Sequence, residues 1–366
     1  MKKILTLLLA LWMLTGCVAM AAGNQLVVGS TTAMSGAFFT DLFGSNTADI
    51  DVRALLHGYN LMSWDHETGT YQINDSVVAG MAVSRDAQNN RVYTFDLYGD
   101  LKFSDGSAIT AKDYAFSILL TASPELAKLG GQSAAVGAIL GMDAYQSGKS
   151  SVLRGVRLLS DTQMSITISK AYEPYFYEMA LFDYSPYPIS VLAPGCKVVD
   201  TEKGVGIVNA GGTGTAIFTA ALLQKTILDA ATGYMSHPSV VSGPYTLTSY
   251  DAQRGTASFA INPYYKGNEE GEKPTIETIV YRSVANDEAI DLLLSGEVDL
   301  LNKMVAADTI SKGIQSTADQ PFSVANYPRS GLSMISFSCE RQTVSGKAVR
   351  QAIASCFDRD ALVKAY

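Results

Sequence analysis

The chain has 366 residues, of which 47% are hydrophobic and 17% are charged, and its formal net charge is −8. This length and apolar content suffice for a buried core in about two domains, and they exclude an intrinsically disordered chain. The acidic balance argues against a nucleic-acid partner, because the phosphate backbone requires a basic face.

The first residues have the pattern of a secretion signal. Lys2 and Lys3 precede an apolar run over residues 4–14, which is too short to cross a bilayer as a stable helix. The LTGC segment that ends at Cys17 resembles the bacterial lipoprotein box, in which the chain is cut before an acylated cysteine. Residues 1–22 are therefore predicted to form a lipoprotein signal and tether, with Cys17 as the lipid-attachment site. Ordinary cleavage after Ala21 is the alternative.

The first half of the chain alternates predicted strands and helices. Residues 26–30 form an apolar strand, a long loop rich in Ser, Thr, Gly and Phe follows, and residues 48–62 have helical spacing. Residues 92–103 predict a strand, a turn and a second strand. Thr110 and Asp113 then have the spacing of a capping box, which predicts a helix through residue 122.

Two segments in the middle of the chain suggest ligand chemistry. Residues 171–188 are rich in tyrosine, whose apolar ring and polar tip suit a binding cleft, although such residues also pack where a loop meets a domain surface. Residues 204–214 are rich in glycine but lack the Gly-Lys-Ser/Thr ending of a phosphate-binding loop.

The last third of the chain predicts a hairpin followed by an α/β unit. Residues 242–267 alternate apolar and polar side chains on both sides of a polar turn, as a β-hairpin does. Strand, helix and strand patterns over residues 276–301 predict a βαβ unit. Residues 349–363 have one apolar stripe at helical spacing, which predicts a single amphipathic helix.

Sequence motifs of catalysis and metal binding are missing. The chain lacks a GxSxG elbow, an HExxH helix and paired-cysteine spacing, so no catalytic residue, no metal site and no cofactor are predicted. An extracytoplasmic hydrolase stays open as an alternative, because a Ser-His-Asp triad is assembled in space and not in sequence. A Cys339–Cys356 bridge also stays open, since exported proteins form disulfides.

Five short segments, in order along the chain, resemble words of the extracellular solute-binding proteins of the oligopeptide and dipeptide transport family, family 5. They are FSDGSAITAKD at 103–113, SGPYTL at 242–247, NPYY at 262–265, SGEVD at 295–299, and VRQAI with DR at 349–359. Together, behind a lipoprotein signal, they make the chain similar to this family from about Leu26 to its end.

The resemblance implies an α/β fold, a periplasmic-binding-protein-like clamshell of two lobes with an extra small domain. Residues 26–51 and 170–282 are expected in the first lobe, and residues 52–169 in the inserted smaller domain. Residues 283–366 are expected to begin a second lobe that is incomplete here, because family members continue well beyond the helix at 349–353. Residues 196–241 look like a divergent insertion.

The implied function is capture of a solute by hinge closure and its delivery to the transmembrane permease of an ABC importer. The expected cargo is a peptide; nickel, haem and some sugars are carried by relatives. The protein is expected to be a monomer that is held outside the cytoplasm on the membrane by its lipid, and to be no enzyme. A surface receptor or adhesin without a transport role is a further alternative.

The resemblance also suggests where the ligand lies. Family members bind the ligand backbone between both lobes, and the acid expected from the second lobe lies beyond Tyr366. We therefore expect the 366 residues to bind ligand more weakly than an extended chain. The second candidate contact on the first lobe is Tyr184 with Ser185. The first candidate contact is a loop, for which an ordinary surface loop without ligand contact is the alternative. This loop consists of Leu42, Phe43, Gly44, Ser45 and Asn46.

Overall fold

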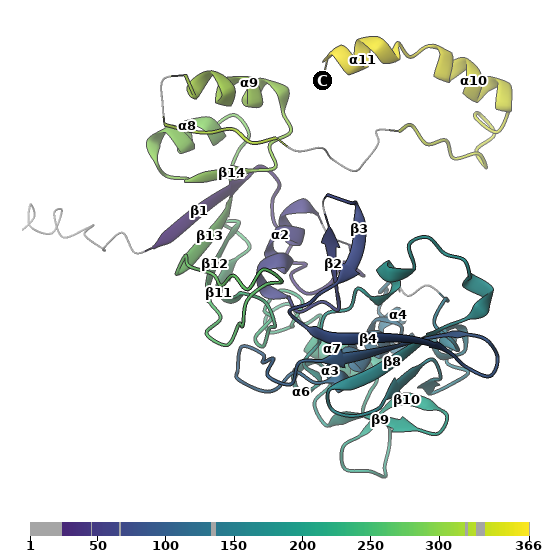
Figure 1. Cartoon of the computed structure of the whole chain (residues 1–366). Coiled ribbons are helices and arrows are strands. Elements are labelled where there is room, and N and C mark those ends of the chain that lie inside the picture. The colour runs from purple at the N-terminus through teal and green to yellow at the C-terminus, as the bar shows by residue number, and fades with distance from the viewer. Residues whose placement is uncertain are drawn as a thin grey trace, which may run out of the picture.

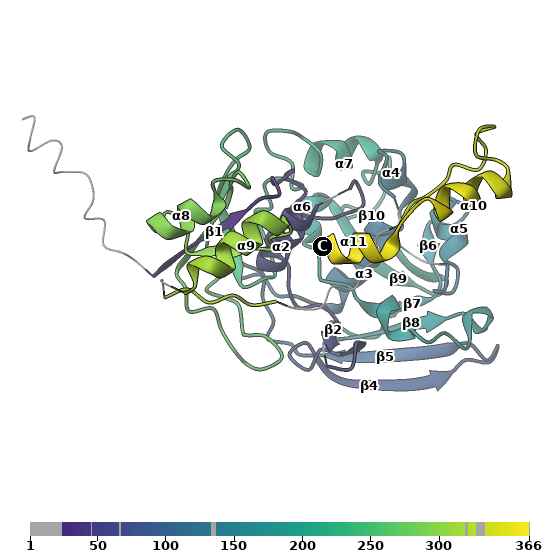
Figure 2. The same ribbon diagram turned by 90° about the horizontal axis from the view of Figure 1, so that it is seen from above.

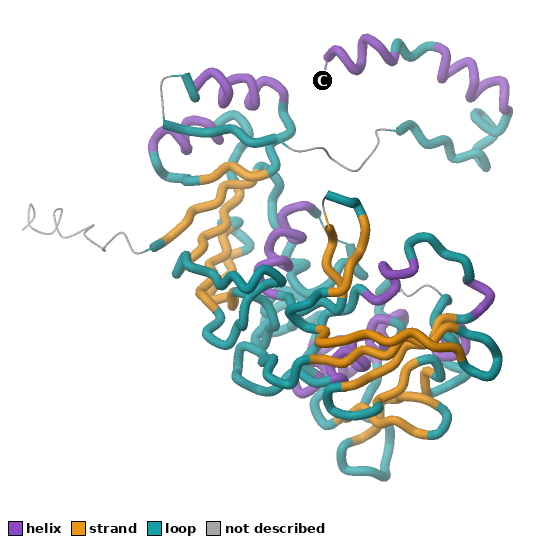
Figure 3. Tube along the Cα trace, viewed as in Figure 1, coloured by secondary structure: helices purple, strands orange, loops and turns teal. Residues whose placement is uncertain are grey.

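The structure, a computed structural model, describes residues 24–44, 46–65, 67–132, 137–318, 321–326 and 334–365. Cys17 lies outside these residues. Figure 1 shows a sheet that contains the N-terminal strand β1 and, beside it, a second body of antiparallel strands around helix α3. The colouring of Figure 3 shows that long loops connect many of these elements.

The first sheet is mixed and has the strand order β11-β12-β13-β1-β14. Strand β1 (Gln25–Ser30) runs parallel to β13 (Thr278–Ser283) and to β14 (Leu300–Asn302). Strand β12 (Thr256–Ile261) is antiparallel to β13 and to β11 (Tyr245–Asp251). The hairpin predicted for residues 242–267 is thereby confirmed, with an irregular register between Leu247 and Ser249.

Helix α2 (Thr47–Leu56) packs on this sheet. Its buried residues Ala48, Val52 and Leu56 are four positions apart and therefore share one helical face. They form one apolar cluster with strand residues that include Phe259 and Tyr281. Burial of this face holds the helix, and the loop that precedes it, in a fixed position against the sheet.

The second body contains two further sheets and a hairpin. One sheet has the order β4-β5-β8-β7 and another the order β6-β10-β9, while β2 and β3 pair with each other. The strands are β2 (Met62–Asp65), β3 (Thr70–Ile73), β4 (Val78–Arg85), β5 (Arg91–Leu97), β6 (Val152–Leu153), β7 (Val156–Leu158), β8 (Gln163–Ile168), β9 (Cys196–Thr201) and β10 (Gly204–Asn209). The helical segments here are α3 (Ala111–Thr121), α4 (Pro124–Ala127), α5 (Met142–Gln146), η1 (Lys170–Tyr172), η2 (Glu178–Phe182), α6 (Ile189–Leu192) and α7 (Ala220–Thr226).

Helix α3 lies at the centre of the larger core. All of its residues except Lys112 and the terminal Thr121 are buried, so its neighbours cover it on every side. The predicted capping box is confirmed at its start. Oδ2 of Asp113 accepts hydrogen bonds from the backbone N of Thr110 at 2.8 Å and from its Oγ1 at 2.9 Å. These bonds satisfy donors that the first helical turn cannot.

The segment of residues 196–209, which the sequence suggests is part of an insertion, belongs to the second body. Strand β10 pairs with β6, and Val205 lies opposite Leu153. Cys196, Val198 and Val205 are buried in the same cluster as α3. Burial of these apolar residues explains why the segment packs here, although the expected boundaries assign residues 170–282 to the first lobe.

The predicted βαβ unit is confirmed as β13, α8 (Ala289–Ser295) and β14, with β1 lying between the two strands. Residues 300–302 therefore share a sheet with β1, although the expected boundary places residues 283–366 in the second lobe. Helix α9 (Ala307–Ser316) follows and packs beside α8.

The single helix predicted for residues 349–363 is wrong, because the structure has two helices there. They are α10 (Lys347–Ser355) and α11 (Arg359–Ala365). The side chain of Asp358 accepts a hydrogen bond from the backbone N of Ala361 at 2.9 Å and so caps a new helix start. Figure 2 shows both helices crossing over the second body in projection, beyond α8 and α9.

Candidate functional site

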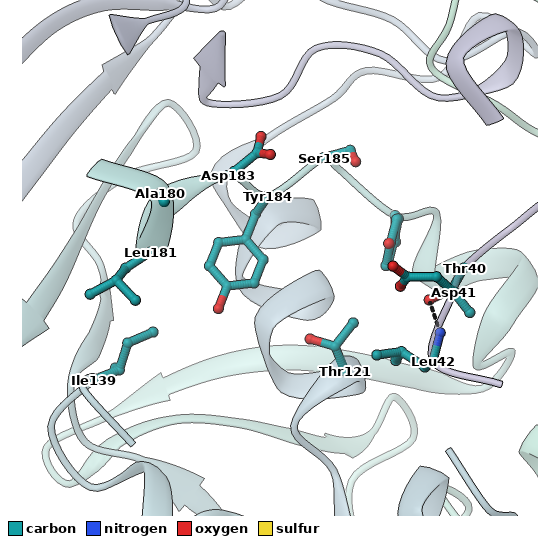
Figure 4. Close-up of a pocket in the computed structure, with 11 residues that line it drawn as sticks. Thr40, Asp41, Leu42, Thr121, Ile139, Ala180, Leu181, Asp183, Tyr184 and Ser185 are labelled. Atoms are coloured by element: carbon teal, nitrogen blue, oxygen red, sulfur yellow. Dashed lines mark hydrogen bonds between the residues drawn. The ribbon is translucent and has the colours of Figure 1, made fainter. Parts of the chain in front are cut away.

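A cavity of about 230 Å³ brings together three of the predicted contact residues. Leu42, Tyr184 and Ser185 line it, although more than 140 positions separate the first from the other two. Figure 4 shows Tyr184 between the side of the cavity that carries Leu181 and Ile139 and the side that carries Thr121 and Leu42. The complete lining is Thr40, Asp41, Leu42, Thr121, Ile139, Ala180, Leu181, Asp183, Tyr184, Ser185 and Tyr187.

The loop after β1 is held at the cavity by its own backbone. The backbone N of Leu42 donates to Oγ1 of Thr40 at 3.3 Å, and the carbonyl of Leu42 accepts from the backbone N of Gln132 at 2.7 Å. The Leu42 side chain is buried and belongs to the cluster around α3. The loop is therefore tied to the second body, and its apolar side chain forms part of the cavity wall.

The other predicted residues of this loop do not line the cavity. Phe43 packs against the core and Gly44 forms a turn, in which its backbone N donates to the carbonyl of Asp41 at 2.8 Å. Asn46 caps α2, since its Oδ1 accepts from the backbone N of Ala48 and of Asp49, both at 3.0 Å. Ser45 lies outside the described residues. These observations give Asn46 a structural role and leave ligand contact by the loop a prediction.

The segment that carries Tyr184 and Ser185 is fastened to two neighbouring elements. The carbonyl of Tyr184 accepts from the backbone N of Leu61 at 3.1 Å, and the carbonyl of Ser185 accepts from Oγ of Ser117 on α3. The backbone N of Tyr187 donates to the carbonyl of Asp113 at 3.3 Å. These bonds hold the backbone in place, and the side chains of Tyr184 and Ser185 line the cavity.

Two carboxylates give the cavity its charge. Asp183 accepts a hydrogen bond from Nδ2 of Asn60 at 2.7 Å. Solvent reaches Asp183, but the surrounding protein still desolvates its carboxylate and raises its pKa, an effect that the Asn60 bond partly offsets. Asp41 is exposed. Burial raises the pKa of the Tyr184 hydroxyl to about 12, so this group is a neutral donor at ordinary pH.

Sequence reasoning missed several lining residues. Asp41 and Asp183 each lie next to a predicted residue, so a wider window around the predicted positions would have included them. Thr121 ends α3 and Ile139 forms an isolated bridge with Ile168. No local pattern marks these two residues, because tertiary packing brings them to the same cavity.

Catalytic and metal chemistry finds no support in the part of the chain that the structure describes. Within it, no three His, Cys, Asp or Glu side chains are grouped to hold a metal ion. Cys196, Cys339 and Cys356 are free thiols, so the bridge between the last two, which the sequence left open, is not formed. A search of the described helices for one long and apolar enough to cross a membrane finds none.

An α/β sheet beside a second body, with a cavity between loops, is an arrangement that can bind a small solute. The profile of the bacterial extracellular solute-binding proteins, family 5, matches residues 76–366. The chain belongs to this family, as its five sequence words predict. The family consists of binding proteins that work outside the cytoplasm, which confirms the predicted non-enzymatic class.

Known relatives are oligopeptide-binding and dipeptide-binding proteins. The oligopeptide-binding protein OppA of Lactococcus lactis subsp. lactis is 27% identical over 233 residues, which are 63% of this chain and 32% of the relative. The periplasmic OppA of Escherichia coli is 33% identical over 30% of this chain and 20% of its own length. The dipeptide-binding protein of Lactococcus lactis subsp. cremoris is 25% identical over 87% of this chain and 54% of its own length.

Solved structures agree with the expected fold. Lactococcal OppA, in complex with an endogenous peptide in the closed conformation, has a TM-score of 0.58 and 20% identity, and the match covers 81% of this chain and 48% of that one. Listeria monocytogenes OppA bound to peptide has a TM-score of 0.56 and 18% identity over 80% and 49% of the two chains. The periplasmic-binding fold is therefore confirmed, and the chain spans about half the length of these structures.

Proposed function

We propose that this protein is the solute-binding component of an ABC importer and that it captures peptides by hinge closure for delivery to the permease. The observation that carries the proposal is the cavity at which Leu42, Tyr184 and Ser185 meet, in a chain of family 5. The curated relatives described above are named for oligopeptide or dipeptide binding, which supports a peptide as the cargo.

Other cargoes are outcomes of the test. One structural neighbour, at a TM-score of 0.53 and 15% identity, is a periplasmic EDTA-binding protein, so the fold also serves a non-peptide solute. Nickel, haem and sugars are further alternatives.

The cargo can be identified from the protein itself. We expect native mass spectrometry of the chain, purified from an exporting host without refolding, to show a mixture of masses that fragment as peptides. A single metal complex, haem or sugar in their place would overturn the peptide assignment. Peptide binding that persists without turnover of ester or peptide substrates would remove the hydrolase alternative.

Association with a permease separates an importer from a surface receptor or adhesin. Crosslinking in the native membrane, followed by capture of this protein, should recover transmembrane subunits of a transporter. Recovery of the protein without such subunits, while peptide binding persists, would favour the receptor reading.

We further propose lipid anchoring through Cys17, on the basis of the LTGC segment. Labelling with a radioactive fatty acid should mark the wild-type chain, and Cys17→Ala should abolish the label and move the protein to the soluble fraction. Ala21→Arg, which blocks ordinary cleavage after residue 21, is the matched control and should leave the label intact. A labelled Cys17→Ala chain, or an unlabelled wild type, would contradict the anchor.

The division into lobes is also a proposal. The sheet pairing of β14 with β1 favours a first lobe that extends to Asn302, with the second lobe beginning after it. The pairing of β10 with β6 favours placing residues 196–209 with the smaller domain. Limited proteolysis should then cut between 302 and the start of α9 before it cuts within residues 283–300.

A further inference from the structure

The carboxylates of the cavity have no cationic partner in the described part of the chain. Asp41 and Asp183 are the charged residues of the lining, and neither takes part in an ion pair with another described residue. Arg53 donates from Nη1 to the carbonyl of Ala37 at 2.7 Å and does not line the cavity. The cavity is therefore negatively charged and open to a positive group.

The two acids differ in how much hydrogen-bonding capacity they keep. Asp183 already accepts from Asn60, whereas the side chain of Asp41 has no hydrogen-bond donor among the described residues. In Figure 4 the Asp41 carboxylate is directed toward the side of Tyr184, while that of Asp183 points away from the Tyr184 ring. Asp41 is thus the better placed of the two to bind a ligand directly.

Tyr184 supplies a polar group and an aromatic face that a ligand in the cavity can contact. Its side chain is half-buried, its hydroxyl points into the cavity (Figure 4), and no hydrogen bond joins that hydroxyl to another described residue. A ligand group that enters the cavity would satisfy the hydroxyl and also lie against the negative face of the ring.

The size and the apolar walls of the cavity limit the kind of ligand group that can fit into it. Its volume of about 230 Å³ is below the roughly 300 Å³ at which pockets begin to enclose a whole small ligand. Leu42, Ile139 and Leu181 supply an apolar surface that suits a chain of methylene groups. Such a space fits one side chain of a larger ligand.

We propose that this cavity is a specificity subsite that takes a lysine or arginine side chain of a bound peptide, with Asp41 as its main charge partner. The inference rests on the proposed function, because it presumes that the ligand is a peptide. The methylene stem lies along Leu42, Ile139 and Leu181, the cationic end meets Asp41, and Asp183 adds negative potential at the rim.

The test compares tripeptides that differ only in their central residue. Calorimetric titrations of the 366-residue chain with Ala-Lys-Ala, Ala-norleucine-Ala and Ala-Glu-Ala at low salt should give affinities in that order, with lysine favoured over norleucine by roughly tenfold. Lysine and norleucine have similar stems, so their difference reports the charge. N-acetylated versions of the same peptides should keep the ratio, whereas a ratio that disappears on acetylation would show that the amino terminus occupies the cavity instead and would overturn the side-chain assignment.

Variants of two acidic residues test which carboxylate causes the preference for lysine. Asp41→Asn should reduce the preference for lysine to about twofold, and Asp41→Lys should reverse the order in favour of glutamate. Glu202→Gln removes one negative charge from the exposed turn between β9 and β10 and is the matched control, which should keep the full preference. Thermal melts of all variants check that they fold. A preference that survives Asp41→Asn, or that Glu202→Gln also abolishes, would overturn the proposal.

Failure of the subsite and failure of the function can be told apart. If all three peptides bind equally well, the protein binds peptides but the cavity does not discriminate between side chains by their charge. Only this inference is then overturned. If no peptide binds at concentrations at which another solute does, both the inference and the proposed peptide cargo are overturned.

Discussion

The Tyr281 hydroxyl donates a hydrogen bond to Oδ2 of Asp51 at 2.8 Å and so joins β13 to α2. The same Oδ2 accepts from Nδ2 of Asn302 at 2.8 Å, and Oδ1 pairs with the ammonium group of Lys303. A single carboxylate on α2 thus holds the ends of two parallel strands. Because the chain leaves the first sheet at Asn302 and Lys303, Asp51 also fixes the point from which residues 304–365 continue.

We expect Asp51→Ala to lower the free energy of unfolding by about 2 kcal/mol, since it leaves three partly buried polar partners without their acceptor. Amide hydrogen exchange of residues 300–303 should also become faster. Asp291→Ala is the matched control, because it breaks the exposed pair between Asp291 and Lys312 and should cost about 0.5 kcal/mol or less. Equal costs in urea denaturation would contradict the role of Asp51.

The entry to the hairpin at residues 242–267 makes a close contact that only glycine allows. A Cβ on Gly243 would lie 2.5 Å from the carbonyl carbon of Leu56 and 2.6 Å from the carbonyl oxygen of Leu55, at the end of α2. Gly243→Ala should therefore destabilise the protein by at least about 2 kcal/mol, because backbone atoms must move apart. Gly211→Ala, where a Cβ meets no atom within 4 Å, should stay within about 0.5 kcal/mol of wild type. Thermal melts of the two variants provide the comparison.

A buried acid fixes the segment that leads into the cavity. Glu178 of η2 binds Nη1 of Arg91 at 2.6 Å and accepts a hydrogen bond from the Tyr93 hydroxyl at 2.9 Å. Glu178→Gln removes the negative charge to which Arg91 and Tyr93 bind. We therefore expect urea denaturation to show a free energy of unfolding that is lower by about 2 kcal/mol. Asp161→Asn, which weakens the exposed pair with Lys112, is the control and should cost about 0.5 kcal/mol or less. A similar cost for both would mean that Glu178 is not needed to hold η2.

His57 should make stability depend on pH. Burial lowers its pKa to about 4, and the contact of its Nε2 with the Phe38 carbonyl at 2.9 Å opposes this only in part. Between pH values of about 6.5 and 4 the unfolded chain binds a proton that the folded chain does not. The contribution is therefore fully present above about pH 6.5 and is lost as the pH falls, by up to about 3 kcal/mol.

Asp113 acts in the opposite sense over part of the same range, since burial raises its pKa to about 6 and the folded chain then holds a proton that the unfolded chain has lost. The effect of His57 is isolated by subtracting the stability curve of His57→Phe from that of wild type. The difference should shrink as the pH falls from about 6.5 to 4. A difference for His57 that stays constant with pH would contradict its buried, neutral state.

Much of the local structure could be predicted from the sequence. The capping box of Thr110 and Asp113 depends on two residues three positions apart, and the hairpin at 242–267 on a period of two. The helix at 349–363 was predicted too long, because the apolar stripe continues through Asp358 while the Asp358 side chain begins a new helix. A periodic pattern indicates which face is apolar, but it does not show where a cap interrupts the helix.

The candidate site could be predicted only in part. The sequence pointed to Leu42, Tyr184 and Ser185, which line the cavity, and also to Asn46, whose side chain caps α2. The loop position was correct for one residue, but the direction of each side chain depends on packing against α3 and the sheet. Asp41, the residue that gives the proposed subsite its charge, lies one position before the predicted loop.

The sequence by itself determined the family, the alternation of strands and helices and the absence of recognisable catalytic motifs, because these are read from short segments whose residues act on their own neighbours. Only the tertiary structure decided that residues 196–209 pack with β6, that β14 joins the sheet of β1, and that Leu42, Ile139 and Tyr184 enclose one cavity. Such contacts join residues from distant parts of the chain. Burial of apolar surface drives them, and it depends on all the surfaces that meet rather than on any one segment.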